Sequence, residues 1–272
     1  MRSILVTGAS GFLGHELLKR IDTSQVRAVA RNEGKLIALK EEHPDIEIIT
    51  GDLANPWTAQ KAMDGIDTVF HLAAYKHVGM AEENVYQCVE SNIIGLANLL
   101  SESFKTVPAT FVFISTDKTS KVSGIYGATK LIGEGLVREA SKINTITKYR
   151  TVKYGNIIKS TGSFLTKWEP KMRKREEVII TDPNATRFFW TIEQAVDLIF
   201  DAVKSAPDCE PWCPSMKAIS MGNALKACQE VWGDCPVKEI GLQRGENLHE
   251  EINGVSSKDV EQFTVKEFKK FL

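Results

Sequence analysis

A tyrosine and a lysine lie four residues apart in the segment Tyr126-Gly-Ala-Thr-Lys130. On a helix this spacing places both side chains on one face. The lysine ammonium can then lower the pKa of the phenol, and the phenolate is a base for a hydroxyl group. A pair on the surface of a helix is the alternative interpretation. The position favours a base, because the pair opens a predicted helix that follows a predicted strand.

A carboxyl group and an amine end that strand, in Ser115-Thr116-Asp117-Lys118. Side by side at the mouth of a cleft, they are typical of acid–base catalysis. Oxidising an alcohol needs one base, whereas eliminating water beside a ketone needs a second base for the carbon acid and an acid for the leaving hydroxyl. The alternative is a solvated charge pair. We predict these catalytic residues: Thr116, Asp117, Lys118, Tyr126 and Lys130.

The loop between the first predicted strand and the first predicted helix contains three glycines. Glycines permit a tight turn and a close approach of the backbone, and the helix that begins near Phe12 directs its free N–H groups toward a pyrophosphate. A strand-to-helix turn without a ligand is the alternative. The predicted dinucleotide contacts in this loop are Gly8, Ser10, Gly11, Phe12, Leu13 and Gly14.

The Gly-x-x-Gly-x-x-Gly spacing resembles that of the short-chain dehydrogenases/reductases. The resemblance implies a nicotinamide cofactor that Tyr126 and Lys130 also contact. Arg31 follows the second strand, where a guanidinium can pair with a 2′-phosphate, so NADP is predicted over NAD. A surface arginine in solvent is the alternative. The resemblance also implies cofactor contacts at Asp52, Leu53, Ala73 and Ala74, and a supporting role for Asn92.

Short apolar runs alternate with helix-length segments up to about residue 155. The predicted strands are Ile4–Thr7, Val26–Ala30, Ile46–Thr50, Thr68–Leu72, Thr110–Ser115 and Thr147–Tyr154. The predicted helices are Leu13–Ile21, Gly34–Glu42, Thr58–Met63, Val85–Phe104 and Tyr126–Ser141. Strict alternation predicts an α/β fold, a Rossmann-type doubly wound parallel sheet. We assign it to residues 1–155, and a smaller carboxy-terminal substrate lobe to residues 156–272, some of whose segments return to the first domain.

The motifs of residues 115–130 resemble those of a narrower family, the soluble, C5-inverting UDP-N-acetylglucosamine 4,6-dehydratases of bacterial polysaccharide biosynthesis. Further matching blocks follow in order at residues 74–78, 153–156, 160–163, 181–188 and 245–250. The membrane-anchored, retaining relatives usually lack the tyrosine, so Tyr126 favours the short inverting type. The chain departs from the family pattern at Val122, Gly124, Lys153, Lys159 and Thr161.

This resemblance implies that water is removed from UDP-N-acetylglucosamine to give a 4-keto-6-deoxy sugar nucleotide inverted at C5. Tyr126 would deprotonate the C4 hydroxyl while hydride moves to NADP. Lys118 would take the C5 proton, Asp117 would protonate the departing C6 hydroxyl, and the hydride would return to C6. For the diphosphate we expect Arg187, which could instead bridge to Asp182. The predicted substrate contacts are Lys76, Asn156, Ser163, Arg187 and Glu250.

The composition limits the possible partners. The 34 basic and 35 acidic side chains leave a formal net charge of −1, so the overall charge favours neither nucleic acid nor a membrane surface. No apolar run approaches the ~18 residues of a membrane span, and we expect a cytoplasmic protein. The five scattered cysteines are typical of reduced thiols, and no metal is predicted, because Cys209 and Cys213 lack further ligands nearby. A homo-oligomer is expected from the resemblance alone.

Two other functions stay open. A nucleotide-sugar epimerase or reductase would share the cofactor, Tyr126 and Lys130 but release no water, and Asp117 and Lys118 distinguish the dehydratase from it. A non-catalytic NADP-binding regulator could use the same fold, but it would have no need for these four reactive groups together.

Overall fold

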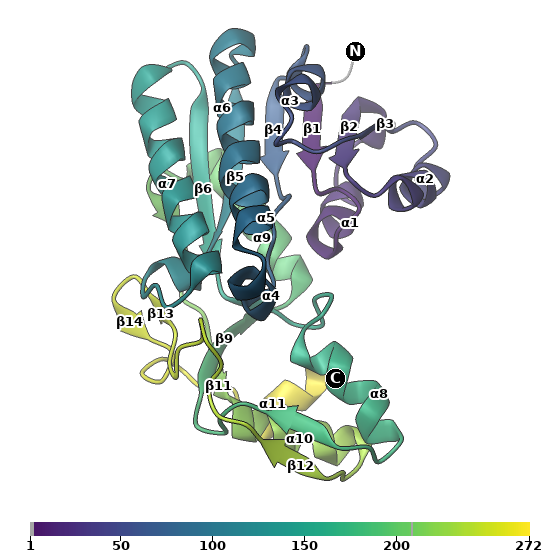
Figure 1. Cartoon of the computed structure of the whole chain (residues 1–272), viewed down its shortest axis with the longest axis vertical. Coiled ribbons are helices and arrows are strands. Elements are labelled where there is room, and N and C mark those ends of the chain that lie inside the picture. The colour runs from purple at the N-terminus through teal and green to yellow at the C-terminus, as the bar shows by residue number, and fades with distance from the viewer. Residues whose placement is uncertain (1–2, 208) are drawn as a thin grey trace.

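The main sheet has seven parallel strands, in the order β10-β6-β5-β4-β1-β2-β3. The computed structural model describes residues 3–207 and 209–272, and Figure 1 shows the arrangement of its elements. The strands are β1 (Ile4–Thr7), β2 (Val26–Ala30), β3 (Glu47–Thr50), β4 (Thr68–His71), β5 (Thr110–Thr116), β6 (Lys148–Tyr154) and β10 (Pro211–Trp212). The predicted Rossmann-type parallel sheet is confirmed.

Helices cover both faces of the sheet. One face packs against α1 (Phe12–Leu18), α2 (Glu33–Glu42) and α9 (Ile192–Ser205). The other face packs against α3 (Pro56–Met63), α6 (Gly95–Thr106) and α7 (Ile125–Ile143). A strand covered on both sides must be apolar on both sides, which explains the continuous burial of β5 at the centre of the sheet.

The chain order reverses between β1 and β4. Strands β1, β2 and β3 run toward one edge of the sheet, whereas β4, β5, β6 and β10 run toward the other. In open parallel sheets a crevice for ligands forms outside the carboxyl ends of the strands at such a reversal. The loops that follow β1, β4 and β5 carry the predicted reactive and cofactor residues to this place.

The elements after β6 divide between the sheet and a carboxy-terminal lobe, which we define as residues 156–191 and 214–272. Figure 1 shows this lobe below the sheet, while α9 and β10 lie against or within the sheet. The lobe contains β7 (Asn156–Ile157), α8 (Phe164–Arg173), β8 (Val178–Ile180), β9 (Thr186–Trp190), β11 (Ala218–Ser220), α10 (Met221–Trp232), β12 (Val237–Glu239), β13 (Glu251–Ile252), β14 (Val255–Ser256) and α11 (Val265–Phe268). It has its own apolar core.

The structure differs from the prediction in the region that follows β4. A short helix, α4 (Val78–Glu83), forms where none was predicted. The helix predicted over Val85–Phe104 is instead α5 (Val85–Val89), a π-helical turn (Glu90–Ile94) and α6. Such π-helical turns are often found at functional sites, and this one contains Asn92. No helix within the described residues is both long and apolar enough to cross a membrane.

Candidate active site

A cavity of about 1620 Å³ extends from the carboxyl ends of the strands into the carboxy-terminal lobe. Every residue that the sequence predicted for the site lines this cavity: Gly8, Ser10, Gly11, Phe12, Leu13, Gly14, Arg31, Asp52, Leu53, Ala73, Ala74, Lys76, Thr116, Asp117, Lys118, Tyr126, Lys130, Asn156, Ser163, Arg187 and Glu250. The fold therefore brings these residues together, and their individual roles stay predictions.

The glycine loop between β1 and α1 is a tight turn that packs against protein backbone and has no room for side chains at Gly8 and Gly11. Gly8 has a φ of +69°, and a Cβ atom there would lie 2.8 Å from the backbone nitrogen of Ala73. A Cβ atom on Gly11 would lie 3.0 Å from the carbonyl oxygen of Gly8. Gly11 is also the N-cap of α1 and provides no side-chain cap. The loop thus fits the close approach of a dinucleotide backbone.

Arg31 directly follows β2 on the rim of the cavity. Its side chain is 54% exposed, and its Nη1 atom lies 3.6 Å from Oδ2 of Asp52. Lys35 lines the same region. Sequence reasoning missed Lys35, although its position in the first turn of α2 was an available signal. Arg31 and Lys35 thus place two positive charges on this rim of the cavity.

Tyr126 and Lys130 lie in the first two turns of α7, where Tyr126 is half-buried and Lys130 is buried. Burial raises the pKa of Tyr126 to about 12, whereas Lys118 and a hydrogen bond with Thr116 lower it. Burial lowers the pKa of Lys130 to about 8. The Nζ atom of Lys130 donates to the carbonyl oxygen of Ile114 at 2.7 Å. Lys130 points to strand β5, and Lys118 is the cation that lowers the pKa of the phenol here, so the expected effect of Lys130 on Tyr126 stays a prediction.

Four charged side chains meet at the end of β5. The Nζ atom of Lys118 lies 3.1 Å from Oδ1 of Asp117 and 3.1 Å from Oε1 of Glu250. The same Oε1 atom lies 3.9 Å from Nε of Arg187. Two cations thus balance two carboxylates, and side-chain exposure does not exceed 15% for any of the four. A solvated charge pair, the alternative for Asp117 and Lys118, does not describe this cluster.

Asp117 has one oxygen that is still available. Oδ1 accepts hydrogen bonds from Thr116 Oγ1 at 2.9 Å and from Lys118 Nζ at 3.1 Å. Oδ2 is buried and has no hydrogen-bond partner among the described residues. Burial raises the pKa of Asp117, Lys118 opposes this, and Glu250 adds to it, so the pKa lies above its ordinary value. A buried carboxyl group of this kind can carry a proton to a ligand.

Arg187 does not form the predicted alternative bridge to Asp182. Its Nη1 atom donates to the carbonyl oxygens of Thr186 at 2.9 Å and Leu248 at 3.1 Å, and its Nε atom faces Glu250. Oδ1 of Asp182 instead accepts from a backbone amide in its own turn, at 2.7 Å. Among the described residues these hydrogen bonds use only Nη1 of the guanidinium, so Arg187 stays a predicted contact to the diphosphate.

Three lysines that sequence reasoning missed line the same cavity, namely Lys167, Lys171 and Lys174. The first two belong to α8, and the third is the C-cap of that helix. Residues at i, i+4 and i+7 share one helical face, so the spacing itself was a signal for a basic surface.

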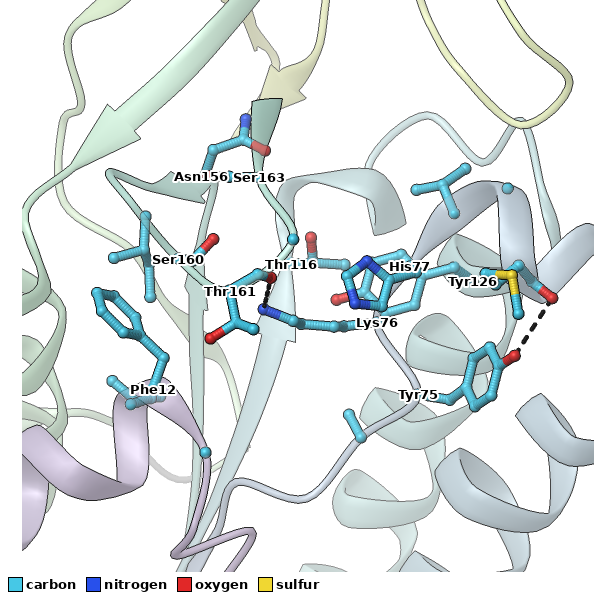
Figure 2. Close-up of a pocket in the computed structure, with 18 of the residues that line it drawn as sticks. Phe12, Tyr75, Lys76, His77, Thr116, Tyr126, Asn156, Ser160, Thr161 and Ser163 are labelled. Carbon is cyan, nitrogen blue, oxygen red and sulfur yellow. Dashed lines mark hydrogen bonds between the residues drawn. The ribbon is translucent and has the colours of Figure 1, made fainter. Parts of the chain in front are cut away.

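Figure 2 shows the part of the cavity where the glycine-loop helix and the lobe face each other. Phe12 of α1 lies across from Lys76, whose Nζ atom donates to the carbonyl oxygen of Thr161 at 2.9 Å. Asn156 Nδ2 donates to the carbonyl oxygen of Phe188 at 3.2 Å. Ser163 Oγ is buried and has no hydrogen-bond partner among the described residues, so it can form a hydrogen bond with a hydroxyl group of a ligand.

Asn92 supports the site through the loop that follows β4. Its side chain accepts a hydrogen bond from the backbone nitrogen of Tyr75 at 2.7 Å and donates to the carbonyl oxygen of Tyr75 at 3.0 Å. It also donates to Thr129 Oγ1 on α7 at 3.0 Å. This residue therefore ties the loop that carries Lys76 to the helix that carries Tyr126.

The parallel sheet, the glycine loop and the Tyr126–Lys130 pair in one cavity define the class as an extended short-chain dehydrogenase/reductase. More narrowly, the chain belongs to the polysaccharide biosynthesis protein family, whose model matches residues 4–270.

Similar proteins agree with this family. An uncharacterized membrane protein of Methanocaldococcus jannaschii, MJ1061, is 32% identical over 92% of this chain and 80% of its own length. An inverting UDP-N-acetylglucosamine 4,6-dehydratase of Campylobacter jejuni is 30% identical over 92% of the chain and 76% of its own length. A UDP-glucose 4-epimerase of Rickettsia canadensis is 27% identical over 95% and 79%.

Among solved structures, that of Pen from Bacillus thuringiensis superposes with a TM-score of 0.92 at 27% identity. The match covers 99% of this chain and 96% of that chain. The relatives named for an activity are nucleotide-sugar dehydratases and epimerases, and the chain is a member of their superfamily.

Proposed function

We propose that the protein removes water from UDP-N-acetylglucosamine with NADP as cofactor and yields a 4-keto-6-deoxy sugar nucleotide inverted at C5. The observation that carries this proposal is the direct contact of Asp117 and Lys118 at the end of β5, in the cavity that Tyr126 lines. Oxidation of an alcohol or epimerisation at C4 needs no such second acid–base pair. The inverting dehydratase among the relatives supports the same choice.

The glycine loop, Arg31 and Lys35 are the residues that would hold NADP. The cofactor would supply reversible hydride transfer, which takes a hydride from C4 of the sugar and gives it back at C6. Cations at the end of β2 support NADP rather than NAD, because they can neutralise a 2′-phosphate. Lys130, whose pKa burial lowers to about 8, stays a predicted contact to the cofactor ribose.

Three side chains of the chain move protons around the sugar in this proposal. Tyr126 takes the proton of the C4 hydroxyl, and Lys118 helps because it lowers the pKa of the phenol. The ketone at C4 acidifies C5, and Lys118 removes the C5 proton. Asp117 gives its proton to the C6 hydroxyl, which leaves as water. Return of a proton to the opposite face of C5 inverts that centre.

For the substrate diphosphate we propose the basic face of α8 in addition to Arg187. Lys167, Lys171 and Lys174 line the cavity and are partly or fully exposed. Arg187 lines the same cavity, and its hydrogen bonds to Thr186 and Leu248 use only Nη1. Lys76 and Asn156 would then lie nearer the sugar. The cytoplasmic location and the homo-oligomeric state stay predictions.

Mass spectrometry of the purified protein with NADP and UDP-N-acetylglucosamine tests this function. The expected product has lost one water, and in D₂O it carries deuterium at C5. Lys118→Ala should abolish deuterium incorporation at C5, because no amine is left to exchange that proton. Lys121→Ala, at an exposed lysine three residues further on, serves as the control.

Three outcomes would contradict the proposal in different ways. Undiminished C5 exchange in Lys118→Ala would exclude the elimination mechanism. A change of configuration at C4 without loss of water would favour the epimerase, an activity carried by the Rickettsia relative. No turnover of any nucleotide sugar in a panel would favour a non-catalytic regulator.

A further inference from the structure

Glu250 reaches the reactive groups from the carboxy-terminal lobe. Only 1% of its side chain is exposed, and Oε2 accepts a hydrogen bond from Asn247 Nδ2 at 3.3 Å. Ser257 fixes its backbone: the amide of Glu250 donates to Ser257 Oγ at 2.9 Å, and the amide of Ser257 donates to the carbonyl oxygen of Glu250 at 2.7 Å. The lobe therefore holds this carboxylate in place independently of Lys118.

Lys118 lies between this carboxylate and that of Asp117, at 3.1 Å from each. The other charged or titratable groups that act on it are Arg187 from β9 and Tyr126 from α7. Burial lowers the pKa of Lys118. Asp117 and Glu250 together raise it by more, so the net pKa lies well above its ordinary value. An amine can remove a proton from carbon only when it is neutral, so the ammonium must first lose a proton.

Asp117 is the better acceptor of that proton. Burial raises the pKa of Asp117 against the effect of Lys118, and Glu250 raises it as well. Burial also raises the pKa of Glu250, but Lys118 and Arg187 lower it more, so that the net pKa of Glu250 lies below its ordinary value. Glu250 thus stays ionised, at 3.1 Å from Lys118, while a proton moves between its two neighbours.

We propose that Glu250 is a positioning residue that keeps one proton on the Lys118–Asp117 pair and aligns the pair for elimination. This inference rests on the proposed dehydration. The Lys118 ammonium passes its proton to Oδ1 of Asp117. The neutral amine takes the C5 proton, the C–O bond at C6 breaks, and Asp117 protonates the departing hydroxyl to water. Lys118 is again an ammonium and Asp117 a carboxylate, so one elimination returns the pair to its starting charges.

A pH titration of the Lys118 Nζ resonance in lysine-labelled protein tests the charge effect without any turnover. The resonance is assigned by its absence in Lys118→Arg. Glu250→Gln keeps the shape of the side chain but removes the negative charge, so the midpoint should fall by about one pH unit or more. Glu251→Gln, on the next residue of the same segment, should leave the midpoint unchanged. Glu250→Asp retains the charge one methylene further away, and a smaller fall is expected.

A merely structural role of Glu250 predicts no such shift. Thermal unfolding shows which of Glu250→Gln and Glu250→Asp folds. An unchanged midpoint of the Lys118 titration in a variant that folds would overturn the proposal. In the same variants the alkaline limb of the kcat/KM profile for water release should move to lower pH, because the shared proton is lost more easily. If the wild-type protein releases no water, the proposed dehydration fails, while the titration still decides the role of Glu250.

Discussion

Arg31 is the side chain that we expect to favour NADP over NAD. It stands where the backbone leaves β2, and it is half-exposed, with Asp52 as its only charged contact among the described residues. The long interatomic distance of 3.6 Å leaves the guanidinium free to turn toward a phosphate. The neighbouring Lys35 can add a second positive charge.

Replacing Arg31 with Ala should raise the KM for NADP about 10- to 100-fold, the usual cost of one charged hydrogen-bonding partner. The KM for NAD should change little, because NAD carries no 2′-phosphate. Steady-state kinetics with both cofactors measure the ratio, and Arg138→Ala on the exposed side of α7 is the control. Equal losses with NADP and NAD would show that Arg31 does not contact the 2′-phosphate.

At the scale of elements, α7 holds the turn that carries Asp117 and Lys118, the proposed acid–base pair. Oε1 of Glu134 accepts hydrogen bonds from Ser115 Oγ at 2.5 Å and Thr119 Oγ1 at 2.9 Å, and it lies 3.1 Å from Nζ of Lys153 on β6. These contacts join the end of β5, the turn after it and the neighbouring strand to one buried carboxylate. The lysine stands where the family pattern usually has arginine, and it still reaches its partner.

Lys153→Met should destabilise the protein by roughly 3–5 kcal/mol, because it leaves the Glu134 carboxylate buried without its cation. Urea unfolding measures the free-energy difference. Lys148→Met, at an exposed position of the same strand, should change the unfolding free energy by well under 1 kcal/mol. A loss no larger than that of Lys148→Met would show that the buried pair contributes little.

A separate prediction concerns substrate binding by the basic face of α8. Substituting Ala for Lys171 should raise the KM for the nucleotide sugar about tenfold and leave kcat nearly unchanged, since a diphosphate contact acts equally on bound substrate and transition state. Lys226→Ala on α10, outside this cavity, provides the comparison. A fall in kcat without a change in KM would place Lys171 away from the diphosphate.

At the scale of the whole molecule, the stability of the sheet should depend on pH through one buried histidine. His71 is the last residue of β4, and its Nδ1 atom forms a hydrogen bond with Oγ1 of Thr7, the last residue of β1, at 2.8 Å. Its ring stacks on Phe113 with a centroid distance of 6.2 Å. Burial, with a contribution from Lys130, lowers the pKa of His71 to about 3. The folded protein therefore keeps this ring neutral.

Stability should consequently fall as the pH drops below the ordinary histidine value of 6.5 toward 3. In this window the unfolded chain binds a proton that the folded protein does not, and one such group contributes up to about 1.4 kcal/mol per pH unit. Denaturant titrations at several pH values measure the slope. His71→Gln should flatten it relative to wild type, whereas His43→Gln, at a surface turn, should not. An unaltered slope in His71→Gln would exclude this residue as its source.

Much of the fold follows from local pattern. The alternation of apolar runs and helical segments specified strands β1 to β6 to within about two residues, because buried parallel strands must be apolar along their whole length. The π-helical turn at Glu90–Ile94 was not predictable in this way. Its Asn92 side chain bonds to Tyr75 and Thr129, which are distant in sequence, and such contacts leave no local pattern.

The sequence by itself determined which residues could react, because glycine spacing, the Tyr126–Lys130 interval and the Asp117–Lys118 pair are local features. Only the tertiary structure decided how they are charged. Glu250 and Arg187 lie far from Lys118 along the chain but contact it or each other in space. Burial and such contacts set the pKa of every reactive group here, and both exist only after the lobe has packed against the sheet.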